Sequence, residues 1–399
     1  MSWPEHIGVG GLCASAVSAS RCQLLGDAAL DAIGEWVAGG STKSVSSFPF
    51  DAVLGHYRAV GRYFVAAPVV GALAEARAAG TWRKDNPWFD QWLASATDQA
   101  SGDYAGYAFV PALTDFMTGA EVGSRTVAAD ALTVAALLDL LSVELDALAV
   151  ESSAAQRRRT RATALALCRA DELAPNAPLV SSARLAANLH PDCEALDAAF
   201  RDSLAEPESP AVRDARKLLS LSMMPVTIMH DEQMFIRSIQ LFEIQFELCR
   251  LALENVAVCL EKRDGCRAVT QLHAATKRLR AVRVYSRILA TMPPSSFSVI
   301  RKYTHGRSAI QSRTYRDVEV VAARTAWLRY TEFRPEADSR VCAAVADGLD
   351  NFDRSWQAMK KTHWGITLKT IGRVPGTGGT EGADYLRARA ACSLFPEPL

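Results

Sequence analysis

The stretch TIMHDEQMFIRSIQLFEIQFELC, residues 227–249, predicts the fold class of the chain. Apolar side chains recur in steps of four and three residues, at Phe235, Ile239, Phe242, Phe246 and Cys249. This spacing brings them onto one face of an α-helix, which is then buried against other elements. Asp231 and Glu232 occupy the predicted first turn, where negative charge complements the helix dipole. We therefore expect a long helix with one buried face.

The same helical periodicity extends along most of the chain. Alanine-rich segments dominate, runs of alternating β-branched residues are few, and two further long helices are expected over roughly 266–291 and 340–371. Pro293 and Pro294 end the first of these, because proline lacks the N–H that a helix interior needs. The segment SLAEPESPAVRD, residues 203–214, marks the clearest boundary. The sequence therefore predicts an all-α protein, with a helical N-terminal region at 1–205 and a helical bundle domain at 211–399.

Composition and charge narrow the class of protein. The chain of 399 residues is 49% hydrophobic, which is enough to bury a large core. Its 44 basic and 44 acidic residues cancel, so no net field favours nucleic acid or an anionic membrane, and a small neutral partner is expected. The longest apolar run, residues 128–150, is interrupted by Asp130, Asp139, Glu144 and Asp146. These charges favour an amphipathic helix over a membrane span.

The cysteines and the N-terminus indicate the compartment. The nine cysteines are scattered, form no CxxC pair or CxxCH haem-attachment motif, and fit a reducing cytoplasm. The N-terminal apolar stretch follows no basic segment, so a signal peptide is not expected. The basic cluster QRRRTR, residues 156–161, is interpreted as a solvated helix face rather than a binding patch.

His363 is the most informative single residue. It lies on a second stripe with steps of four and three: Phe352, Trp356, Met359, His363, Ile366 and Thr370. The imidazole is therefore expected to face the core. A core histidine bonded to a carbonyl or carboxylate explains this placement. A zinc site lacks histidines at helical spacing, and a Ser-His-Asp triad lacks a GxSxG elbow. A single imidazole in an apolar cavity is also how a protein offers an axial ligand to haem iron.

Three motifs in order resemble the tryptophan 2,3-dioxygenase family. They are HDEQMFI…Q…E at 230–243, SFSVIRKYTHGRSAIQSRTYR at 296–316, and a histidine followed by IG and GTGG at 363–379. An upstream segment, YAGYAFVPAL at 104–113, is similar to the family segment that lines the substrate pocket. The resemblance covers roughly residues 215–390 and implies an all-α helical bundle that binds haem b.

The resemblance also assigns roles to individual residues. His363 would be the axial haem ligand, and Ser308 would lie at the cofactor. Arg301 would grip the substrate carboxylate, to which a guanidinium offers two parallel charge-assisted hydrogen bonds. Thr377, in the glycine loop, would contact the charged end of the amino acid. The remaining substrate-lining positions would be Phe235, Ile239, Phe297, Tyr104 and Tyr107.

Two departures from the family pattern make the predicted pocket more apolar. The distal histidine of the family is Ile239 here, and the tyrosine of its Y-x-x-FR motif is Phe297. An isoleucine cannot accept a proton, so no catalytic general base is assigned.

The expected function follows the resemblance. It implies a haem-dependent oxygenase that uses O₂ on the aromatic ring of tryptophan or a tryptophan-derived amino acid, in specialised metabolism. Ring rearrangement is an alternative, because the tryptophan-rearranging branch of pyrrolnitrin biosynthesis also has a long N-terminal region and an aliphatic distal residue. A non-catalytic haem-binding sensor is another, and a homo-oligomer is compatible with each.

Overall fold

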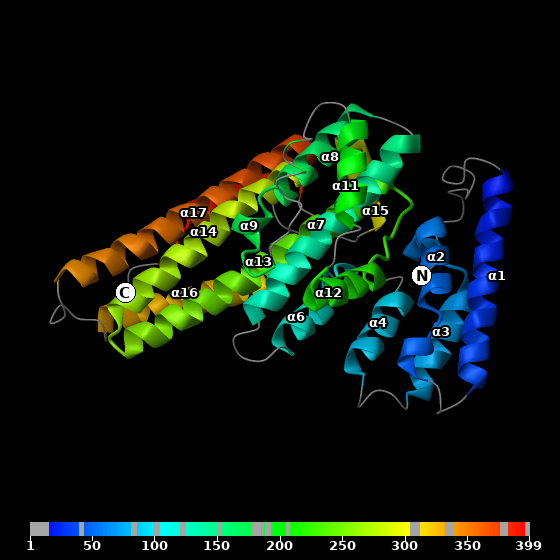
Figure 1. Cartoon of the computed structure of the whole chain (residues 1–399), viewed down its shortest axis with the longest axis horizontal. Helices are drawn as coiled ribbons and strands as arrows, with labels where there is room; N and C mark the ends of the chain where they lie inside the picture. The colour runs from blue at the N-terminus through cyan, green and yellow to red at the C-terminus, as the bar shows by residue number, and fades with distance from the viewer. Residues whose placement is uncertain are drawn as a thin grey trace.

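The computed structural model describes residues 16–39, 44–80, 86–98, 104–119, 125–150, 153–177, 185, 187, 193–204, 208–303, 312–331, 339–375 and 382–395. Within these ranges every regular element is a helix and no strand occurs, which confirms the predicted all-α class. Figure 1 shows an elongated molecule with its N-terminal helices at one end and the tips of its longest helices at the other.

The helices form three groups along the chain. The first comprises α1 (Ala16–Ala38), α2 (Phe50–Val60), α3 (Ala67–Ala79), α4 (Pro87–Thr97), α5 (Tyr104–Tyr107) and α6 (Val110–Thr118), with short 3-10 helices η3 (Val45–Ser47) and η4 (Arg62–Phe64). The second comprises α7 (Arg125–Val150), α8 (Ala154–Leu167), α9 (Ala170–Leu173), α11 (Cys193–Leu204) and α12 (Pro210–Leu221). The third comprises α13 (His230–Glu261), α14 (Gly265–Leu289), α15 (Pro294–Tyr303), α16 (Arg313–Thr331), α17 (Ser339–Ile371) and α18 (Ala383–Ala391).

The long helices α13, α14, α16 and α17 pack as a bundle. The spans predicted for α14 and α17 agree with the structure within two residues, whereas α13 continues to Glu261, beyond the stretch that predicted it. Gly348 lets α17 approach α14 closely, because a Cβ there would lie 2.9 Å from Cδ1 of Leu272. A layer of three rings crosses the bundle, with centroids 5.4 Å apart for Phe246 and Tyr315, 5.7 Å for Phe246 and Trp356, and 5.0 Å for Tyr315 and Trp356. We call this layer the aromatic floor. Phe246 and Trp356 come from the predicted stripes of α13 and α17, and Tyr315 comes from α16.

The C-terminal helix α18 packs on α17. The buried ammonium of Lys360 donates hydrogen bonds of 2.8 Å to the carbonyls of Arg389 and Cys392, where α18 ends. A cation at this position satisfies carbonyls that the helix leaves unpaired and complements its dipole.

Helix α7 is the central helix of the second group. It is long and apolar enough to cross a membrane, but 72% of its most apolar window is buried inside the structure, which is typical of a core helix. The carboxylates that interrupt the run each have a cationic partner on another helix. Asp130 pairs with Arg278, Asp139 with Arg237, and Glu144 with Arg159. The burial of these charges is thereby compensated.

The first group has its own core, in which rings of Trp36, Phe48, Phe89 and Trp92 contact one another edge-on or stacked. Gly61 connects this group to the bundle: its φ is +80°, and a Cβ there would lie 2.7 Å from the carbonyl oxygen of Val226. Only glycine tolerates both conditions. The largest core cluster contains residues on both sides of the predicted boundary at 205–211, and the division into two regions stays a prediction.

The basic cluster at 156–161 is only partly solvated. Arg157 and Arg158 are exposed as predicted, but the prediction is wrong for Arg159, whose side chain is 0% exposed. Arg159 lies 3.1 Å from Glu144, pairs also with Asp231, and donates to the Thr291 hydroxyl at 3.1 Å. The periodicity of one helix does not reveal that its partner helices bring two carboxylates to a single face.

This cluster yields a stability prediction. Replacing Arg159 with Leu leaves Glu144 buried without its cation, so we expect the free energy of unfolding to fall by about 3–5 kcal/mol. The matched control is Arg158→Leu on the exposed face, where a change within about 0.5 kcal/mol is expected. Urea denaturation of both variants measures the difference. Equal stability of the two variants would contradict the assignment.

Candidate functional site

Two residues on facing helices define the level of the candidate site. Helices α13 and α17 run in opposite directions through the bundle and meet at the Phe246–Trp356 contact of the aromatic floor. Ile239 lies seven residues from Phe246 toward the start of α13, and His363 lies seven residues from Trp356 toward the end of α17. Seven residues span about 10 Å of helix, so each side chain lies two turns from the Phe246–Trp356 contact, on the same side of it.

His363 presents a neutral imidazole. The ring is partly buried, and burial lowers the pKa of His363 below its usual range because the charged form is desolvated. Within the described ranges no side chain or carbonyl forms a hydrogen bond with this ring. A neutral imidazole has a nitrogen lone pair for a metal. Among the described residues, no group of three or more His, Cys, Asp or Glu side chains gathers in a way that could hold a metal ion.

The predicted ring-binding residues come together beside this level. The ring centroid of Phe235 lies 5.4 Å from that of Phe297 and 6.3 Å from that of Tyr107. Ile239, only 6% exposed, belongs to the same apolar cluster as Tyr107, and Phe235 packs against it. We call Tyr107, Phe235, Ile239 and Phe297 the ring wall. Three elements, α5, α13 and α15, contribute to it, and α15 also packs against α17.

Arg301 lies near the end of α15 and points toward the start of the glycine loop. Its guanidinium donates a hydrogen bond to the carbonyl of Pro375, the last described residue before that loop. Two segments 74 residues apart in sequence are therefore adjacent. Thr377 and Ser308 lie outside the described residues, and Tyr104 begins α5 without a described side chain.

Glu232 has a role that the sequence did not reveal. Its buried carboxylate accepts hydrogen bonds from the backbone N–H groups of Val226 (2.7 Å) and Thr227 (2.8 Å), from the Thr227 hydroxyl (2.5 Å) and from the Tyr107 hydroxyl (2.9 Å). Burial raises the pKa of Glu232, and these hydrogen bonds act in the opposite direction. The carboxylate holds one end of the ring wall in place rather than only complementing the helix dipole.

Tyr107 is fixed by several further contacts. Burial and the neighbouring Glu232 carboxylate raise the pKa of Tyr107, which keeps its hydroxyl protonated as the donor. The guanidinium carbon of Arg62 lies 5.8 Å from the ring centroid, within cation–π range. Gln240 donates hydrogen bonds of 3.0 Å to the carbonyl of Ala108 and to the hydroxyl of Ser222. Sequence alone gave no signal for Arg62, because it lies outside every motif.

A second buried carboxylate connects the first two motifs. Glu243 on α13 accepts a hydrogen bond of 2.8 Å from the hydroxyl of Ser312 and another from Thr314. The Ser312 oxygen in turn accepts the backbone N–H of Tyr315 at 3.1 Å, as an N-terminal cap does. The start of α16 is thereby fixed to α13.

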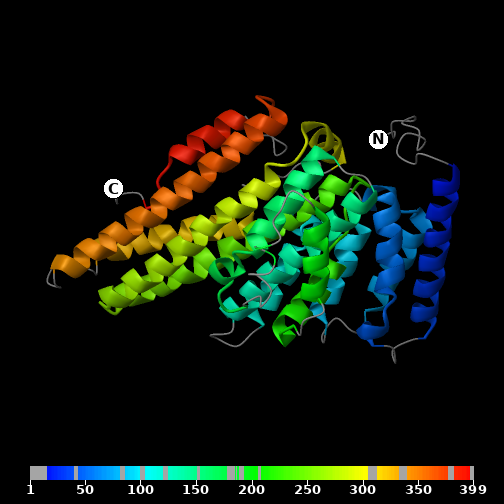
Figure 2. The same cartoon turned by 45° about the horizontal axis from the view of Figure 1, so that its top comes forward.

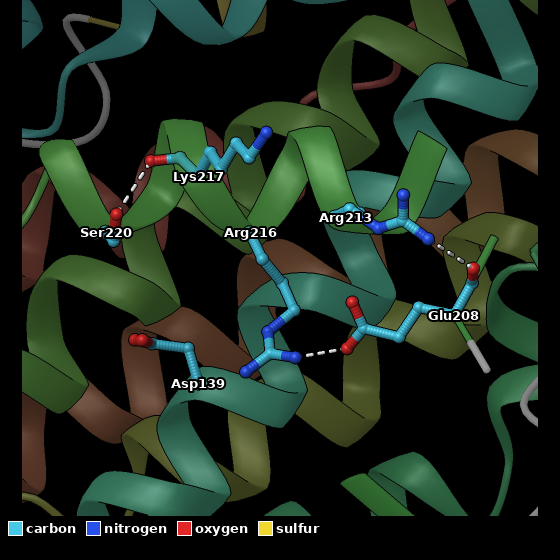
Figure 3. Close-up of a pocket in the computed structure, with 6 residues that line it drawn as sticks. All are labelled: Asp139, Glu208, Arg213, Arg216, Lys217 and Ser220. Atoms are coloured by element: carbon cyan, nitrogen blue, oxygen red, sulfur yellow. Dashed lines mark hydrogen bonds and ion pairs between the residues drawn. The ribbon is translucent and has the colours of Figure 1, made fainter. Parts of the chain in front are cut away.

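A separate cleft of about 310 Å³ lies at α7 and α12 and is lined by Asp139, Glu208, Arg213, Arg216, Lys217 and Ser220 (Figure 3). Arg216 pairs with Glu208, and Asp139 with Arg237 outside the lining, so three of the five charged side chains that line the cleft are compensated by these pairs. Pockets for flat organic ligands are lined mainly by apolar and aromatic side chains. This cleft does not offer that lining.

Comparison with known proteins connects the chain to named relatives. The tryptophan 2,3-dioxygenase of Anaeromyxobacter sp. (strain K) is 25% identical over 225 residues, which cover 42% of this chain and 85% of the relative. That of Pseudomonas fluorescens is 26% identical over 252 residues, covering 46% and 86%. Tryptophan 2,3-dioxygenase 1 of Ralstonia nicotianae is 24% identical over 229 residues, covering 42% and 78%. No family model matches the chain.

Proposed function

The chain is a relative of the tryptophan 2,3-dioxygenases, and on that premise we propose that it is a haem-dependent oxygenase of tryptophan or a tryptophan-derived amino acid. The proposal is supported by the ring wall and by His363, which lies seven residues beyond the aromatic floor on α17. One desolvated imidazole and an aromatic wall suit a flat cofactor and a flat substrate.

The proposed cofactor is haem b, with His363 as the axial ligand and Ser308 at its edge. The neutral ring of His363 fits this role, because iron takes the unprotonated nitrogen. When bound, haem supplies the activation of O₂ that amino-acid side chains do not provide. The residues of the chain position the substrate and exclude water.

The proposed substrate lies between the ring wall and the glycine loop. Arg301 would exchange the Pro375 carbonyl for the substrate carboxylate, which offers a stronger, charge-assisted pair. Thr377 would contact the charged end of the amino acid. Phe235 and Phe297 would pack on the aromatic ring, and Tyr104 and Tyr107 would complete the lining. Burial of the ring among these side chains excludes water from it.

No proton acceptor is assigned on the ring wall. Ile239 has no titratable group, and the Tyr107 hydroxyl already donates to Glu232. The ring N–H of the substrate would therefore meet an aliphatic surface at Ile239. This feature favours ring rearrangement as a second candidate reaction, as in the pyrrolnitrin branch, and supports a role in specialised metabolism.

The proposal includes a cytoplasmic location. The seven cysteines with described side chains are thiols rather than disulfides, as is usual in a reducing compartment. Tryptophan-like amino acid and O₂ are the expected partners, and a homo-oligomer is compatible with them.

Haem retention tests the axial assignment. We expect His363→Ala to lose most of its haem, because a non-covalent cofactor without its protein ligand dissociates. The control is His273→Ala, an exposed histidine on α14, which should keep the haem content of the wild type. Pyridine haemochrome assay and the Soret spectrum measure both. An unchanged Soret band and haem content in His363→Ala would show that another residue binds the iron.

Substrate binding tests Arg301. Removing one partner of a buried charge pair costs roughly 2–5 kcal/mol, so Arg301→Leu should weaken L-tryptophan binding by more than an order of magnitude. Tryptamine, which lacks the carboxylate, should bind both proteins alike. The neighbouring exposed Lys302→Leu serves as control. Titrations against the haem spectrum give the Kd values. If tryptophan and tryptamine weaken equally, Arg301 does not bind the carboxylate.

The third test concerns Ile239. A wall without a hydrogen-bond acceptor discriminates weakly between a ring with a free N–H and a ring without one. The wild type should therefore bind 1-methyltryptophan about as well as tryptophan. Ile239→His should restore a preference for the free N–H and shift the product toward N-formylkynurenine, detected by mass spectrometry. A wild type that strongly prefers the free N–H already has another acceptor, and the reading of Ile239 would then be wrong.

A further inference from the structure

The 3-10 helix η4 brings two aromatic side chains of the N-terminal region to the end of α15. The ring centroid of Tyr303, the last residue of α15, lies 5.1 Å from that of Tyr63 and 5.4 Å from that of Phe64. Tyr63 and Phe64 are themselves 5.3 Å apart. We call these three residues the aromatic trio. None of them lies at a position to which the family resemblance assigns a role.

Tyr303 also packs against an apolar cluster that includes two ring-wall residues, Tyr107 and Ile239, and Phe235 packs against the same cluster. Tyr303 follows Arg301 by two residues at the end of α15, a spacing that directs the two side chains to different faces of the helix. Tyr303 therefore contacts both this cluster and the rings of η4.

The position of η4 is fixed by backbone contacts. The N–H groups of Arg62 and Tyr63 donate to the carbonyls of Pro225 (2.8 Å) and Val226 (3.5 Å). Val226 is also held through its own N–H by the Glu232 carboxylate. The close approach at Gly61 makes this arrangement possible. The aromatic trio and the ring wall are thus attached to the same short segment.

The protein itself does not fully cover these rings. Phe64 is 37% exposed, and Tyr63 and Tyr303 are partly buried. Large aromatic side chains that remain accessible beside an apolar cluster supply contact area for a ligand ring at low conformational cost. Trp327 on α16 is another exposed aromatic side chain, and it belongs to none of these clusters.

We propose that Tyr303, supported by Tyr63 and Phe64, is a further specificity-determining residue that packs on the bicyclic aromatic ring of the amino acid held by Arg301. The N-terminal region would then build part of the substrate site. This inference rests on the proposed function, because it takes the carboxylate position from Arg301. Tyr303 would contact the substrate ring, and Tyr63 and Phe64 would act by holding Tyr303 in position.

The experiment uses the haem-loaded full chain. L-tryptophan is titrated against the Soret band of the wild type, Tyr303→Leu, Tyr303→Phe and the double variant Tyr63→Leu/Phe64→Leu. Tyr303→Leu should weaken binding roughly three- to tenfold, the range for one lost ring–ring contact. Tyr303→Phe keeps the ring and should stay within about twofold. The double variant should show a smaller loss in the same direction, and Trp327→Leu, on the distal part of α16, should show none.

Two readouts separate ring recognition from a loss of structure. Cyanide binds the iron directly, so its affinity should be the same in every variant, and haem content should match the wild type. Unchanged tryptophan affinity in Tyr303→Leu overturns the inference. If Tyr303→Leu fails to retain haem, the variant Tyr63→Leu/Phe64→Leu is measured in its place. A tryptophan affinity equal to that of the wild type in this double variant then overturns the inference. A wild type without a Soret band, or without a response to tryptophan, instead contradicts the proposed function.

Discussion

The buried carboxylate of Glu232 connects more of the molecule than any other single side chain near the site. Its four hydrogen bonds join the start of α13 to Val226, Thr227 and Tyr107. A buried carboxylate is tolerated only when its oxygens are satisfied, so each donor has to stay in place. Because η4 pairs with the same segment, the N-terminal region, the ring wall and α13 share one anchor. The geometry of the candidate site depends on this anchor.

The carboxylates of helix α7 also need partners, and these partners come from several helices of the fold. Three of its four carboxylates pair with arginines from α14, α13 and α8, so each of these ion pairs fixes one neighbouring helix against the central one. Apolar contacts alone tolerate sliding by a turn, because the ridges and grooves of helices repeat. If one helix slid by a turn, a buried charge would lose its ion-pair partner. This loss costs far more free energy than the repacking of a methyl group. The acidic residues that interrupt the apolar run thereby set the register of the helices around it.

The sequence allowed the long helices of the bundle to be predicted, because the stripes on α13 and α17 repeat over many turns. The same stripes placed Phe235, Ile239 and His363 on particular helix faces. Partners distant in sequence were not predictable from one chain. Arg159 looked solvated because its own helix gives no sign of Glu144 and Asp231. Tyr303 carried no signal, because its role depends on η4, which lies more than two hundred residues earlier.

The aromatic floor has a consequence for the route by which ligands enter. Trp356 is fully buried and stacks on Tyr315, so rings fill the bundle axis two helical turns from His363. Ligands of the proposed enzyme would therefore not reach His363 along the bundle axis through this layer.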